Sequence, residues 1–95
     1  MKTRDFLLES GIYPNLLGFN YTLRAVELVK ENNLIKVYDG IYEQIAKEFY
    51  TKPRCVERAI RNVVQHIKLE DFKKVGVNFR LTNGQFIHFL AFMEG

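Results

Sequence analysis

The stretch that most constrains the fold is residues 42–68, which reads as a short helix, a tight turn and a longer helix. The first helix is predicted over residues 41–49 and the second over residues 53–68. Apolar residues in the second helix recur at i, i+3, i+4, i+7, i+8 and i+11, which makes one continuous stripe. The stripe consists of Val56, Ala59, Ile60, Val63, Val64 and Ile67. The rest of the chain is expected to be organised around this pair of helices.

The break between the two helices is predicted at residues 50–53. Thr51 is a suitable N-cap, because its hydroxyl can accept a hydrogen bond from a first-turn N–H group. Pro53 fits a first turn, where a backbone N–H has no partner within the helix. Ala46 is small enough to let the second helix cross the first closely. This is the layout of a helix-turn-helix, whose second helix, the recognition helix, enters the DNA major groove.

Positive charge is concentrated on this second helix. Residues 51–68 carry five basic residues and one acidic residue, which is +4, whereas the whole chain is +3. On a helical wheel, the side opposite the apolar stripe carries Arg54, Arg58, Arg61 and Gln65. Arginine suits a groove-facing position, since its fork can bond guanine O6 and N7 together or grip a phosphate. An ordinary solvated amphipathic helix has the same pattern, so both interpretations stay open on the pattern alone.

The remaining sequence predicts an all-α fold, a compact bundle of five to six helices of the winged or effector-domain type. Further helices are expected over residues 3–9, 19–31, 69–75 and 83–93, with one helical turn at 34–38 and extended chain at 77–81. Gly11 and Gly76 are expected to end the helices before them. Thr82 and Gln85 spell a capping box. The residues assigned to the core include Leu69, Phe72, Phe79, Phe86, Phe89 and Phe92.

Composition and length exclude several classes of protein. Ninety-five residues are expected to form one domain, 1–95. The sequence has neither an apolar run of about 18 residues nor a signal peptide. A lone cysteine, Cys55, excludes an internal disulfide and favours a reducing, cytoplasmic compartment. His66 and His88 lack a second ligand at helical spacing, so no metal site and no cofactor are predicted. An enzyme is the poorest interpretation, because Cys55 has no oxyanion element or third partner.

Residues 45–64, IAKEFYTKPRCVERAIRNVV, resemble the C-terminal effector domain of the stage-zero sporulation response regulator of endospore-forming bacteria. The most specific part is VERAIR at residues 56–61, which is close to the signature of that family's recognition helix. GFNY at residues 18–21 is similar to a Gly-Tyr-x-Tyr segment of the family, and TNGQFI at residues 82–87 resembles its Thr-Asn-x-x-Phe-Ile. The resemblance covers roughly residues 11–92 in the same order.

The resemblance implies a domain that binds a short guanine-containing operator in double-stranded DNA, as a homodimer or as tandem copies. Glu57, Arg58 and Arg61 match positions of base and backbone contacts in the family, and Asn62 is their neighbour on the helix. Lys52 is expected near a phosphate, and Glu57 is expected to accept from a cytosine amino group or to orient an arginine. The full predicted DNA-binding set is Lys52, Arg54, Glu57, Arg58, Arg61, Asn62 and Gln65.

Two departures from the family affect the expected function. Cys55 stands where the family has an arginine that reads a guanine, and Arg54 lies about 100° round the helix, so it cannot replace that arginine. Losing one such contact lowers discrimination by about 1–3 kcal/mol. The chain also starts at its own methionine without the family's receiver domain, so phosphorylation control is not expected within it. The alternative interpretation is a protein-interaction module that modulates RNA polymerase or a full-length family regulator.

Overall fold

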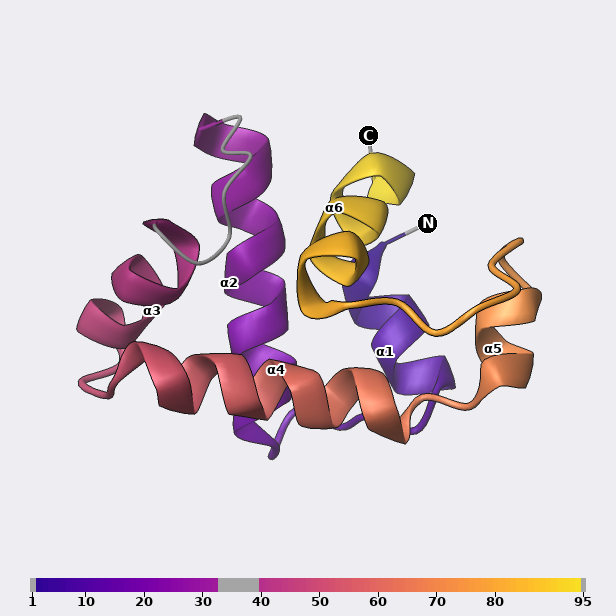
Figure 1. Ribbon diagram of the computed structural model, residues 1–95, viewed down its shortest axis with the longest axis horizontal. Coiled ribbons are helices and arrows are strands. Elements are labelled where there is room, and N and C mark those ends of the chain that lie inside the picture. The colour runs from indigo at the N-terminus through magenta and orange to yellow at the C-terminus, as the bar shows by residue number, and fades with distance from the viewer. Residues whose placement is uncertain (1, 33–39, 95) are drawn as a thin grey trace.

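The computed structural model describes residues 2–32 and 40–94 of the chain. Within these ranges it contains six helices and no strand. The helices are α1 (Thr3–Glu9), α2 (Leu17–Asn32), α3 (Tyr42–Glu48), α4 (Pro53–His66), α5 (Leu69–Lys73) and α6 (Asn83–Glu94). Figure 1 shows α4 running across the base of the molecule, with α1, α2 and α6 above it, α3 near one end and α5 near the other. The predicted all-helical fold is therefore confirmed.

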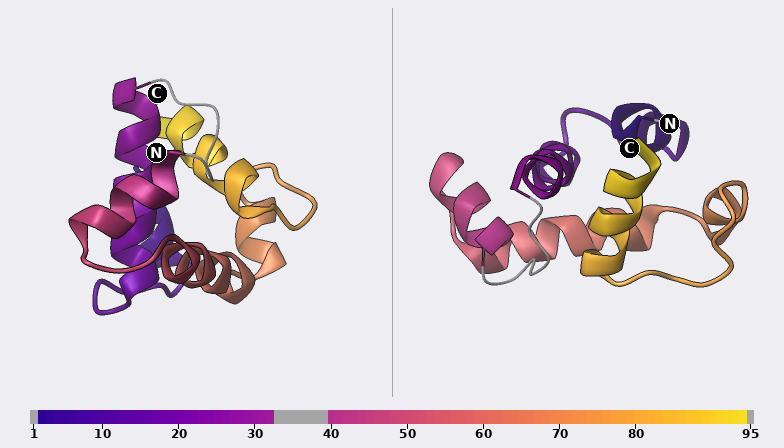
Figure 2. Two further views of the ribbon diagram at one scale, coloured as in Figure 1. Left: turned by 60° about the vertical axis from the view of Figure 1, so that its left-hand side comes forward. Right: turned by 90° about the horizontal axis from the view of Figure 1, so that it is seen from above.

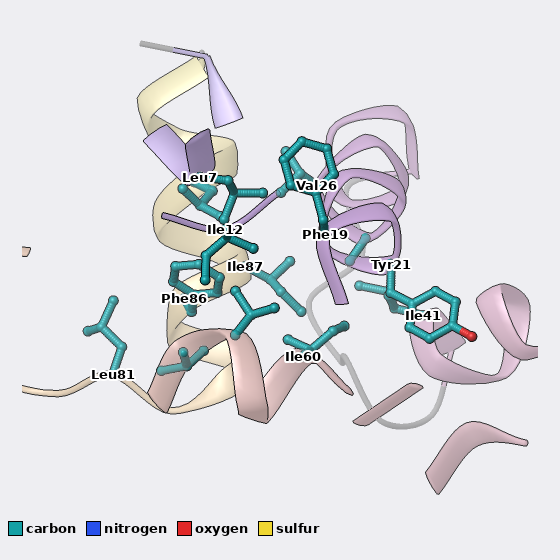
Figure 3. Close-up of a cluster of buried hydrophobic side chains, with 14 of the residues drawn as sticks. Leu7, Ile12, Phe19, Tyr21, Val26, Ile41, Ile60, Leu81, Phe86 and Ile87 are labelled. Carbon is teal, nitrogen blue, oxygen red and sulfur yellow. The ribbon is translucent and has the colours of Figure 1, made fainter. Parts of the chain in front are cut away.

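Helix α4 is central because its apolar stripe is buried along its whole length. Val56, Ile60, Val63 and Val64 are buried, Ile67 is buried just beyond the helix, and Ala59 is partly buried. Seen from above in Figure 2, α6 crosses α4 and α2 lies beside it, and both helices contact α4. Figure 3 shows Ile60 below side chains from α2 and α6, including Phe19, Phe86 and Ile87. The stripe predicted from sequence is thus the floor of the hydrophobic core.

Two glycines end helices as the sequence predicts. Gly11 has φ 84°, and the N–H groups of Gly11 and Ile12 donate to the carbonyls of Leu8 and Leu7. Gly76 has φ 86° and is held by an equivalent pair of bonds at the end of α5. This is the Schellman arrangement, in which a left-handed residue lets the chain satisfy the last helical carbonyls.

The predicted helix boundaries need small corrections. Helix α2 starts two residues earlier than expected, and α3 is one residue shorter at each end. Helix α4 ends at His66 rather than at residue 68, because Ile67 is extended and Lys68 already serves as the N-cap of α5. Helix α5 ends at Lys73 rather than at residue 75. The helical turn predicted at residues 34–38 lies outside the described residues.

Three residues assigned to the core from sequence lie on the surface instead. Leu69 is 38% exposed, because Phe72 is the residue through which α5 packs against the core. Phe79 is 60% exposed, since the chain bends there while Val77 and Leu81 turn inward. Phe92 is 81% exposed because it lies on the side of α6 opposite Leu90. In α6, where most residues are apolar, the sequence pattern does not indicate which face is buried.

Candidate nucleic-acid interface

The turn between α3 and α4 is tight although it contains no glycine. Tyr50 occupies the left-handed region with φ 56°, and its side chain is 97% exposed. The N–H groups of Phe49 and Thr51 donate to the carbonyls of Ile45 and Ala46 at 2.9 Å. A bulky residue at this φ is strained. The turn therefore keeps its shape through the closing hydrogen bonds, and the tyrosine ring gains no packing from it.

Helix α4 begins at Pro53 as predicted, but its N-cap is not the predicted residue. Lys52 is its N-cap and makes no side-chain capping bond, so the assignment of Thr51 as N-cap is wrong. The backbone N–H of Thr51 is used to close α3, which leaves Thr51 inside the turn. Pro53 occupies the first turn as predicted. The N–H groups of Cys55 and Val56 both donate to the carbonyl of Lys52.

The outer face of α4 gathers the predicted basic residues on one surface. Lys52, Arg54, Arg58 and Arg61 are all exposed, on the side away from the buried stripe. Glu57 is half-buried at the edge of this face, and its Oε1 lies 3.4 Å from Nη1 of Arg61. The four cations form an electropositive strip one helix long, with a carboxylate placed to orient one of them.

Asn62 and Gln65 are exposed, and both border a groove on one flank of α4. The opposite wall of this groove is the segment that leads into α2, which contributes Leu16 and Leu17. The structure thus places Asn62 and Gln65 beside the basic strip, where they also face a partly apolar surface. Sequence reasoning did not indicate this groove, because its two walls are far apart in the chain.

Gly18 at the groove floor lets α2 approach α4 very closely. A Cβ atom built on Gly18 would lie 2.5 Å from Val63 Cγ2 and 2.6 Å from the Ala59 carbonyl oxygen. Real Cβ atoms essentially never approach other heavy atoms so closely. The glycine of the GFNY segment is therefore required by helix packing. The absence of a side chain at this position sets how closely α2 and α4 can pack.

Two polar residues that sequence reasoning did not assign to the site hold α4 from the side of α6. Asn83 Nδ2 donates to the Glu57 carbonyl at 3.0 Å and to the Tyr42 hydroxyl at 3.1 Å. Arg80 Nη1 donates to the Val64 carbonyl at 3.0 Å, near the C-terminus of α4. Basic groups at this end of a helix satisfy its last carbonyls and complement its dipole. The only sequence signal was the Thr-Asn of the capping box.

That capping box itself forms as predicted and presents Asn83. The N–H of Thr82 donates to Gln85 Oε1 at 3.0 Å, and the N–H of Gln85 donates to Thr82 Oγ1 at 3.2 Å. The reciprocal pair fixes the start of α6. Because Asn83 is the first residue of α6, its side chain leaves the helix from a rigid point.

Helix α3 is in turn fixed to α2 by an ion pair. Arg24 Nε and Nη2 donate to the two carboxylate oxygens of Glu48 at 2.7 and 2.9 Å. Hydrogen bonds from Arg24 and Gln44 lower the pKa of Glu48 to about 2. Bidentate arginine–carboxylate pairs are geometrically specific. Helix α3, which precedes α4, is therefore tied to α2 at its C-terminal end.

Cys55 is exposed near the start of α4, between basic neighbours. A hydrogen bond from the Thr51 hydroxyl lowers the pKa of its thiol, and the charges of Arg54 and Arg58 act in the same direction.

Among the described residues, no group of three or more His, Cys, Asp or Glu side chains could hold a metal ion. No helix in that part of the chain is long and apolar enough to span a membrane.

Comparison with known families gives one match that covers almost the whole chain. The family described as "Sporulation initiation factor Spo0A C terminal" matches residues 3–93. The match includes all six helices except the last residue of α6, and it includes every residue of the basic strip on α4. It therefore spans the helix-turn-helix and the helices that support it.

Proposed function

Since the chain belongs to the family of C-terminal domains of sporulation initiation factor Spo0A, we propose that it is a sequence-specific transcriptional regulator with α4 in the DNA major groove. The family consists of DNA-binding regulatory domains of response regulators and is not a family of enzymes. The observation that carries the proposal is the basic strip, in which Arg54, Arg58 and Arg61 are exposed opposite a buried stripe. A helix with this polarity can insert its outer face into a groove without disturbing the core.

Within this proposal the residues of the strip divide between positioning and base recognition. Arg58 and Arg61 face base edges or the rim of the groove, where an arginine fork can bond one guanine twice. Glu57, at 3.4 Å from Arg61, orients that guanidinium. Lys52 lies before the first turn of α4, where a phosphate of the backbone passes a recognition helix. Asn62 and Gln65 add neutral hydrogen-bonding groups along the flank.

The test measures the affinity of the chain for a family-type operator duplex and for a scrambled duplex. Fluorescence anisotropy gives both affinities at several salt concentrations. If Lys52, Arg54, Arg58 and Arg61 all neutralise phosphates, log affinity for DNA falls with log salt at a slope of roughly −3.6. Each arginine that bonds a base instead makes the slope less steep. A preference for the operator supports the proposal. Equal affinity for both duplexes contradicts sequence recognition.

Variants separate recognition from folding. Arg58→Ala and Arg61→Ala should weaken operator binding and leave the free energy of unfolding within about 0.5 kcal/mol of the original. Ile60→Ala, at a fully buried position, should lower that free energy by about 2–5 kcal/mol. Lys73→Ala is the matched control, because it also removes one positive charge but does so on α5, outside α4. If Arg58→Ala unfolds the domain, that arginine has a structural role.

A second candidate function is a protein-interaction module that modulates RNA polymerase or a full-length regulator of the same family. The observation that favours it is the exposure of large apolar side chains outside α4, which include Phe79 and Phe92. Absence of DNA binding at low salt, together with loss of partner binding on Phe92→Ser, would favour this candidate.

For the DNA-binding function, we also propose that copies of the domain bind side by side on DNA and act in the cytoplasm.

A further inference from the structure

A single buried amide joins both helices of the helix-turn-helix. Asn83 is 7% exposed, and its Nδ2 group donates to two acceptors on different helices. One acceptor is the hydroxyl of Tyr42 on α3, at 3.1 Å. The other is the carbonyl oxygen of Glu57 on α4, at 3.0 Å. The donor comes from α6, which lies outside the motif, so α6 is bonded to both helices of the motif.

The geometry of an amide makes this a directional constraint. The two N–H bonds of an asparagine side chain lie in one plane at a fixed angle, so two acceptors bonded to them cannot rotate independently. A buried amide that loses either bond is left with an unsatisfied donor. The Glu57 carbonyl also accepts the helical bond from the Arg61 N–H, as α-helical geometry requires. Asn83 therefore grips α4 at the turn that carries Glu57 and Arg61.

We infer that Asn83 is a positioning residue for DNA recognition, which sets the orientation of α4 against α3. This inference rests on the proposed function. Base contacts need their donors and acceptors aligned, whereas contacts to phosphates fix the register and carry no sequence information. A small rotation of α4 misaligns Arg58 and Arg61 with base edges and still leaves their charges near the backbone. Loss of the Asn83 bonds should therefore lower specificity far more than non-specific affinity.

A merely structural role for Asn83 would give a different result. Thr22 provides the comparison, because it is buried in α2 and its Oγ1 donates to the Gly18 carbonyl at 2.7 Å. Removing that bond also removes a buried hydrogen bond, yet it joins no residue of α3 to α4. If Asn83 acts only through stability, Asn83→Ala and Thr22→Val should change DNA binding in the same way.

The experiment measures the specificity ratio, which is the affinity for an operator duplex divided by the affinity for a scrambled duplex. The operator duplex is one that the wild-type chain selects from a random library. Asn83→Ala, Tyr42→Phe and Thr22→Val are compared at a temperature at which circular dichroism shows each to be folded. We expect Asn83→Ala to lower the ratio about tenfold, the effect of one lost base contact. Its affinity for the scrambled duplex should stay within about twofold, because the charges are unchanged.

Tyr42→Phe keeps the aromatic ring and removes one of the two acceptors, so we expect a smaller fall in the ratio of about threefold. If Asn83→Ala does not fold, this variant decides the question. An unchanged ratio in the folded variants overturns the inference and leaves the proposed function intact. An equal fall in Thr22→Val also overturns it. If the wild-type chain selects no duplex, the proposed function fails first and the inference fails with it.

Discussion

Replacing Gly18 by alanine tests whether close contact between α2 and α4 determines the fold. The added Cβ would lie 2.5 Å from Val63 Cγ2 and 2.6 Å from the Ala59 carbonyl oxygen. The valine methyl can move by rotation, but the carbonyl belongs to the backbone of α4 and moves only with the helix. Relieving both contacts therefore requires α2 and α4 to separate, which also withdraws core side chains from each other.

The magnitude follows from two opposing effects. Overpacking a well-packed interior costs about 1–3 kcal/mol. Alanine in place of glycine in a helix gains at most about 1 kcal/mol of propensity, and Gly18 is only the second residue of α2. The cost of overpacking exceeds the gain in helix propensity, so Gly18→Ala should lower the free energy of unfolding by about 1–2 kcal/mol. For a domain of this size that is a fall in Tm of roughly 4–16 °C.

Urea denaturation followed by circular dichroism measures this effect, and Val63→Ala provides the second arm of a double-mutant cycle. Removing the valine methyls relieves one of the two contacts, so Gly18→Ala should cost less in the Val63→Ala background. It should still destabilise there, because the Ala59 carbonyl remains. A Gly18→Ala variant as stable as the original chain would refute the argument that helix approach requires glycine here.

Three further predictions concern single positions. Tyr50→Gly should raise the free energy of unfolding by about 1 kcal/mol in urea, since φ 56° is strained for tyrosine and its exposed ring loses no packing. Tyr50→Ala, which keeps a Cβ, should not. Burial raises the pKa of Glu94, but hydrogen bonds from Thr3 and Lys30 outweigh it and hold this pKa at about 2. A lowered carboxyl pKa gives stability that is present above the unfolded value of about 4.5 and lost as pH falls towards 2. Thermal melts between pH 7 and pH 3 should therefore show a smaller loss for Glu94→Gln than for the original chain. Cys55→Arg should strengthen binding to a guanine-containing operator at least about fivefold in anisotropy titrations, and unchanged affinity would show that this position does not reach a base.

The parts of the fold that depend on local pattern could be predicted from sequence. The stripe of α4 repeats with the helical period and is buried as expected. Gly11, Gly76 and the capping box at Thr82 and Gln85 act through bonds between residues three to five apart. These signals depend only on residues that are close in the sequence, so they can be recognised without knowledge of the tertiary structure.

Other features depend on partners that are distant in the chain. Asn83 bonds residues 26 and 41 positions away, and Arg80 reaches a carbonyl 16 positions away. A single sequence does not indicate which carbonyl a polar side chain will meet. The exposure of Phe92 was also not predictable, because periodicity cannot choose the buried face of a helix in which most residues are apolar.

The outer face of α4 is exposed, so its side chains can be substituted without disturbing the packing of the helix, which bears on what this domain can recognise. Its inner face and backbone are fixed by α2 at Gly18, by α6 at Asn83 and by the buried stripe. Its outer face, including Arg54, Cys55 and Arg58, is exposed and contributes little to that packing. Substitutions on the outer face should therefore change the operator preference and leave stability within about 0.5 kcal/mol. Under the proposed function, cysteine at position 55 is compatible with the family fold and predicts a different DNA preference, because this position lies on the exposed side of α4.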